Sequence, residues 1–112
     1  MYGDQERNRQ RHAIEKLHLA VSTLVGAGGV RERLAEAYLR HLSAVSAKDF
    51  PEELREEYRE IITTLSWEPV EYVGQGRVRS TLHAMSDEEA VLLARRLVGL
   101  YYDVVEYYFD GR

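Results

Sequence analysis

The sequence predicts an all-α fold, a small helical bundle of about four to five helices with a long aromatic loop before the C-terminal helices. Along most of the 112 residues, apolar side chains recur at intervals of three and four, which is the spacing of one helix face. Both prolines fall between these periodic segments rather than inside them. An apolar content of 45% in a chain of this length suits a single helical domain over residues 1–112.

The composition excludes several kinds of chemistry. The chain has no cysteine, so disulfide bonds, thiolate zinc sites and cysteine nucleophiles are excluded. The polar N-terminus has no apolar run that could act as a signal peptide, and the apolar stretches elsewhere carry charges that the centre of a bilayer disfavours. We therefore expect a cytoplasmic protein that does not associate with a membrane.

The first two predicted helices cover about residues 4–25 and 30–46. In the first, Ile14, Leu17 and Val21 share one face. A glycine-rich turn ends this helix, because glycine readily adopts the left-handed conformation that follows a helix. Since the connection between the two helices is short, they should pack as antiparallel neighbours.

The third predicted helix starts at Asp49 and Pro51 and ends near Ser66. The aspartate can accept a hydrogen bond from the first turn, and proline suits the first helical positions. The acidic side chains of this region are interpreted as a solvated helix face. The residues expected to be buried are Leu54, Tyr58, Ile61, Ile62 and Leu65.

The helical spacing stops between Trp67 and about Val78. This stretch is longer than most connections in helical bundles, which usually take about 2–8 residues. Trp67 and Tyr72 are large aromatic residues for a loop, so the loop either packs over the bundle or presents a contact surface. A short helix is expected over about residues 75–84.

Ser86 and Glu89 predict the start of the final helix, because this spacing forms a capping box. From Ala90 to Phe109 the helix is apolar almost all the way round. A helix on the outside of a domain needs an apolar stripe only about 100° wide. This helix should therefore be central to the fold, or be covered on its second side by another chain.

The leading interpretation is a non-enzymatic protein–protein interaction module. It would form a homo-oligomer, or act as a small helical subunit of a larger bacterial assembly, because no complete catalytic set accompanies the excess of apolar surface. The candidate interface consists of one side of the final helix and two residues of the aromatic loop: Val91, Val98, Tyr102, Val105, Phe109, Trp67 and Tyr72.

A nucleic-acid-binding accessory protein is the first alternative. Arginines cluster near the N-terminus and again after the loop, and arginine is suited to contacts with phosphate. The net charge of −4 disfavours this alternative, since no overall basic field would attract nucleic acid. The candidate residues are Arg7, Arg9, Arg11, Arg77 and Arg79.

A ribonuclease is the second alternative. Arg7 and His12 are separated by four residues, and this spacing resembles the Arg-x4-His motif of ribonucleases of the HEPN family. The resemblance covers one short motif. It implies a site in which two chains combine their arginines and histidines around an RNA phosphate.

Glu15 and His18 form a Glu-x-x-His step, a spacing at which both side chains can bind one metal ion. In carboxylate-bridged bundles, two such steps on different helices hold the metal together with two further carboxylates. The sequence contains no second step. We therefore predict no metal ion and no other cofactor.

Overall fold

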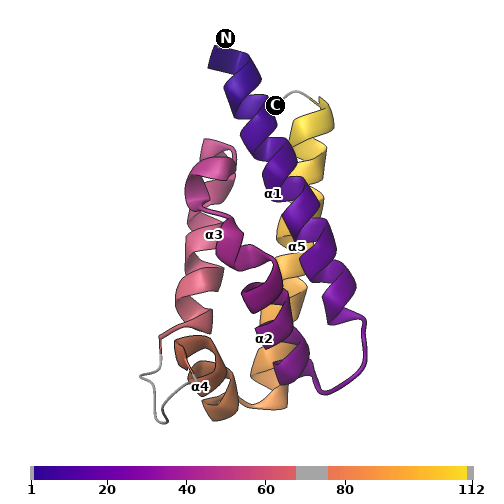
Figure 1. Ribbon diagram of the computed structural model, residues 1–112, viewed down its shortest axis with the longest axis vertical. Coiled ribbons are helices and arrows are strands. Elements are labelled where there is room, and N and C mark those ends of the chain that lie inside the picture. The colour runs from indigo at the N-terminus through magenta and orange to yellow at the C-terminus, as the bar shows by residue number, and fades with distance from the viewer. Residues whose placement is uncertain (1, 68–75, 111–112) are drawn as a thin grey trace.

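The computed structural model describes residues 2–67 and 76–110, and within these ranges it contains five α-helices and no β-strand. The predicted all-α class is therefore confirmed (Figure 1). The elements are α1 (Tyr2–Leu24), α2 (Val30–Arg40), the 3₁₀ turns η1 (Leu42–Ala44) and η2 (Ala47–Asp49), α3 (Glu52–Leu65), α4 (Gly76–Ala84) and α5 (Asp87–Asp110).

Helix α5 is the centre of the bundle, since α1, α2 and α3 all pack against it. The molecule is elongated, with principal extents of 46 × 24 × 20 Å, and α1 and α5 run antiparallel along its length (Figure 1). No helix in the described ranges is both long enough and apolar enough to cross a membrane. We call the buried side of α5 its inner face; it consists of Ala90, Leu93, Leu97, Leu100, Val104 and Tyr108.

The predicted capping box at the start of α5 is confirmed. The backbone N–H of Glu89 donates to the Ser86 hydroxyl at 3.0 Å, and the backbone N–H of Ser86 donates to the Glu89 carboxylate at 3.0 Å. These hydrogen bonds lower the pKa of Glu89. The capping box fixes the residue at which α5 begins.

The second helix is shorter than predicted. It ends at Arg40 rather than near residue 46, and the chain continues through η1 and η2. The hydroxyl of buried Tyr58 is the physical reason, because it donates to the carbonyl oxygens of Leu42 (3.1 Å) and Val45 (2.8 Å). A helix through these residues would direct both carbonyls along its own axis instead.

The predicted role of Asp49 is wrong. Its carboxylate accepts a hydrogen bond from the backbone N–H of Ser46 at 3.0 Å, and it therefore caps η2 rather than α3. Helix α3 begins at Glu52, directly after Pro51, and this start and its end at Leu65 agree closely with the prediction. Asp49 fails to cap α3 because Phe50 and Pro51 have extended backbones that lead the chain away from it.

The acidic face of α3 is more than a solvated surface. Arg96 of α5 donates two hydrogen bonds to the Glu57 carboxylate, at 2.7 and 3.1 Å, and lies 3.5 Å from Glu60. Both Arg96 and Glu57 remain more than one third exposed, so solvent limits the contribution of the pair to less than about 1 kcal/mol. The pair connects α5 to α3 at the edge of the core.

The predicted short helix is confirmed as α4, which spans Gly76–Ala84. Tyr72 and the other residues of the expected aromatic loop from 68 to 75 lie outside the described residues. Trp67 follows the end of α3, and 59% of its surface is exposed.

Tyr58 generates a testable pH dependence. Its burial raises the pKa of its hydroxyl above the ordinary tyrosine value of about 10. The folded state then keeps its proton while the unfolded state loses it, so this stabilisation is complete below pH 10 and decreases as the pH rises above about 10. We expect Tyr58→Phe to lower the free energy of unfolding at neutral pH by about 1–3 kcal/mol.

Denaturant titrations between neutral and alkaline pH would test this. The Phe variant should lose stability less steeply above about pH 10 than the wild type. Equal slopes for the two proteins would contradict the account of Tyr58.

Candidate functional site

The side of α5 away from its inner face carries a row of apolar side chains that the fold covers only in part. We call it the outer stripe: Val91, Val98, Tyr102, Val105 and Phe109. Tyr102 and Phe109 are the most accessible, with 71% and 74% of their surfaces exposed. Val91 is 37% exposed, whereas Val98 and Val105 are half-buried, and Val98 packs against the core. The core therefore does not bury Tyr102 and Phe109.

The outer stripe has a regular repeat. Its three valines are seven residues apart, and Tyr102 and Phe109 each follow a valine after four residues. The remaining position of this pattern, four residues after Val91, is occupied by Arg95. Alternating steps of four and three residues are the spacing at which one helix packs lengthwise against another.

Neighbouring aromatic contacts hold the stripe in place. The Phe109 ring packs edge-on against Tyr108 of the inner face, with ring centroids 5.0 Å apart and an interplanar angle of 81°. Tyr101, which borders the stripe, has its hydroxyl 3.4 Å from Nδ1 of His18 on α1. These contacts reduce the rotamer freedom that an interface would otherwise have to remove.

Two of the N-terminal arginines predicted to bind nucleic acid instead contact α5. Arg11 donates a hydrogen bond to the Tyr108 hydroxyl at 3.1 Å, and the Arg7 guanidinium lies 4.2 Å from the centroid of the same ring. The hydrogen bond from Arg11 lowers the pKa of Tyr108. Together these contacts bind the start of α1 to the end of α5, where Figure 1 shows the two helices side by side.

The other predicted arginines do not join them in one patch. Arg79 on α4 pairs with Glu36 of α2 at 3.1 Å, and Arg77 is exposed on the same short helix. Arg9 lines a polar cavity with several acidic residues. The beginning of α1 and α4 lie at opposite ends of the long axis (Figure 1), so the five arginines form no continuous basic surface.

The Arg7 and His12 side chains are directed to different elements. Arg7 stacks on Tyr108 of α5, whereas Nε2 of His12 lies 3.2 Å from the carbonyl oxygen of Ala44 in η1. The structure therefore does not bring the two residues of the HEPN-like motif together within one chain.

Glu15 and His18 are not part of a cluster. His18 contacts Tyr101, and among the described residues no group of three His, Asp or Glu side chains is arranged to hold a metal ion.

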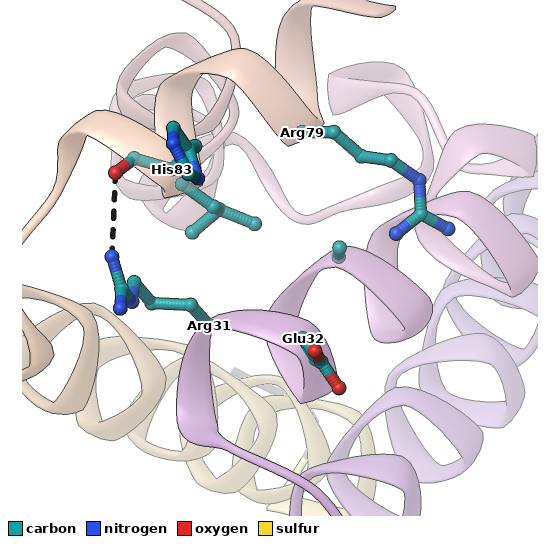
Figure 2. A pocket seen from close by; sticks show the side chains of 6 residues that line it. Arg31, Glu32, Arg79 and His83 are labelled. Atoms are coloured by element: carbon teal, nitrogen blue, oxygen red, sulfur yellow. Dashed lines mark hydrogen bonds between the residues drawn. The ribbon is translucent and has the colours of Figure 1, made fainter. Parts of the chain in front are cut away.

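A cavity of about 250 Å³ lies between α2 and α4 (Figure 2). The two arginines that line it are already paired. Arg31 donates to the carbonyl oxygens of His83 and Met85 and lies 3.1 Å from Asp87, while Arg79 is directed to Glu36. Figure 2 shows both guanidinium groups turned away from the centre of the cavity, so neither is positioned to hold an anionic ligand there.

The chain matches no known protein family, no curated protein and no solved structure at a significant level. The candidate interface residues therefore stay a prediction that rests on the geometry of α5.

The contacts of Tyr108 generate a second prediction. Replacing both Arg7 and Arg11 with glutamine should lower the melting temperature, because it removes the cation–π contact and the hydrogen bond between α1 and α5. Arg9→Gln is the matched control, since Arg9 lies on the same helix but does not contact Tyr108. Ultraviolet titration of the tyrosines should show Tyr108 ionising at higher pH in the double variant. An unchanged tyrosine titration would contradict this role.

Proposed function

We propose that this chain is a self-associating protein–protein interaction module and that the outer stripe of α5 is its binding surface. The observation that carries the proposal is the exposure of Tyr102 and Phe109 on a helix whose opposite side already supplies the core. Tyrosine and phenylalanine are enriched at protein interfaces and depleted at isolated surface positions, because their rings gain most from leaving water.

The energetics favour a modest association. Full burial of a side chain such as Phe109 contributes about 1.5–3 kcal/mol, and the stripe offers two highly exposed aromatic residues and a partly exposed Val91. This gain has to exceed the cost of lost translational and rotational freedom, which is about 4–15 kcal/mol. A contact along one helix is also smaller than the roughly 800 Å² per partner of a standard interface. A micromolar dissociation constant is the expected result.

A second copy of the chain is the partner that fits this surface best. In a two-fold dimer the same patch meets itself, so a stripe with a regular repeat along one helix is complementary to its own copy. A helix pairing requires no further segment of the chain, and α5 runs along the length of the molecule (Figure 1).

Light scattering on the purified chain tests the proposal. We expect the mass of a dimer at concentrations of about 500 µM, where a complex of micromolar affinity is largely formed. Tyr102→Glu combined with Phe109→Glu should give a folded monomer, since both side chains are exposed and their replacement leaves the core intact.

Leu39→Glu is the matched control for this experiment. It introduces one glutamate, half the charge of the double variant, at a 44% exposed leucine of α2 outside the stripe, and should stay dimeric. A monomeric wild type at the same concentration, or a dimer that survives the double substitution on α5, would contradict the proposed function.

A further inference from the structure

We infer that the second copy packs antiparallel on α5, so that Arg95 of one chain lies beside Glu106 of the partner subunit. This inference rests on the proposed function and adds the orientation of the two helices and the ion pair that selects it. Three features of α5 support it independently: the symmetry of the stripe, the distribution of its charges and a glycine near its centre.

The stripe is symmetric about its middle. In an antiparallel pair centred at Leu100, Val91 faces Phe109 of the partner subunit, and Val98 faces Tyr102 of the partner subunit. Each aromatic side chain therefore meets a smaller valine, which allows large and small residues to interdigitate. In a parallel pair, Tyr102 and Phe109 would each meet their own copies, and every valine would meet a valine.

Arg95 and Val105 form the third matched pair of the antiparallel arrangement, with the same centre. The methylene groups of an arginine can cover an apolar side chain while the guanidinium reaches solvent. Arg95 thus occupies a stripe position without interrupting the apolar contact.

Beside the stripe, acidic residues lie towards both ends of α5, with Glu88 near its start, and Arg95 is the basic residue between them. Arg95 lies in its first half, and Asp103 and Glu106 are exposed in its second half. Arg95 and Glu106 are eleven residues apart, about 16 Å along the axis, and nearly three turns place them on the same side of the helix. The midpoint between them falls between Leu100 and Tyr101, within one residue of the centre of the stripe.

Only the antiparallel arrangement brings these opposite charges together. There, each Arg95 meets Glu106 of the partner subunit, and the two-fold axis generates the pair twice. A parallel arrangement would place arginine beside arginine and glutamate beside glutamate, which destabilises a helix pair. Among the residues that the structure describes, no salt bridge within the chain involves Arg95.

Gly99 lies next to the inferred two-fold axis. A glycine in the middle of a helix is less stable than alanine by roughly 0.5–1 kcal/mol. The fold itself does not require it, because a Cβ atom built at Gly99 would have no neighbouring heavy atom within 4 Å. A partner helix that packs closely at this point, with its Tyr102 nearby, would leave no room for a side chain here. This explains why the position is a glycine.

Disulfide cross-linking tests the orientation directly, because the natural chain has no cysteine. Val91→Cys and Phe109→Cys are prepared as separate variants and oxidised alone and as a mixture. The antiparallel dimer predicts a cross-linked product in the mixture and little from either variant alone. Leu39→Cys on α2 is the control and should cross-link with neither.

The possible outcomes distinguish this inference from the proposed function. Self-cross-linking of each variant alone, without additional product in the mixture, would indicate a parallel dimer and overturn the inference while self-association stands. A monomeric wild type in light scattering would overturn both.

Charge reversal tests the ion pair in the same dimer. Arg95→Glu and Glu106→Arg should each raise the dissociation constant severalfold, and the combined variant should restore it towards the wild-type value, because the pair is then reversed but intact. Additive weakening in the combined variant would overturn the assignment of this pair.

Discussion

The burial of the inner face of α5 is the interaction on which the rest of the structure depends. Its leucines at 93, 97 and 100 are almost completely removed from water, and each contributes about 1.5–3 kcal/mol when fully buried. Three other helices pack against α5, so the positions of α1, α2 and α3 are all defined relative to it. The capping box at Ser86 and Glu89 sets where this helix begins.

Fixing the inner face also determines what α5 presents to solvent. A helix has one rotation about its axis, so burying Leu97 and Val104 directs Tyr102 outwards. The pair between Arg96 and Glu57 on one side, and the contacts of Tyr108 with Arg7 and Arg11 on the other, oppose any rotation of α5. The helix that carries the outer stripe is consequently held in one orientation by the rest of the fold.

The sequence was informative wherever the controlling interactions are local. The starts of α3, α4 and α5 were predicted within one or two residues because turn, capping and spacing signals lie within a few residues of each boundary. The separation of α5 into two apolar sides followed from its spacing alone, and the exposure of Tyr102 and Phe109 agrees with it.

Contacts between distant residues could not be read from the sequence. The early end of α2 depends on the Tyr58 hydroxyl, which reaches carbonyl oxygens 13 and 16 residues away. The N-terminal arginines are charged residues in a polar segment, and only the antiparallel course of α1 and α5 brings Arg11 to Tyr108, 97 residues away. A cluster of arginines in a polar segment is also compatible with phosphate binding. The spacing of these arginines alone could therefore not distinguish a structural role from a functional one.

We propose that the second apolar side of α5 is buried by another copy of the chain, so that association would contribute to the stability of the fold. Thermal melting at different protein concentrations measures this most directly. The wild-type melting temperature should rise between about 5 µM and about 500 µM, because binding that is restricted to the folded state stabilises it by mass action. The variant with Glu at positions 102 and 109 should melt at one temperature throughout. A wild-type melting temperature that is independent of concentration over this range would contradict the claim.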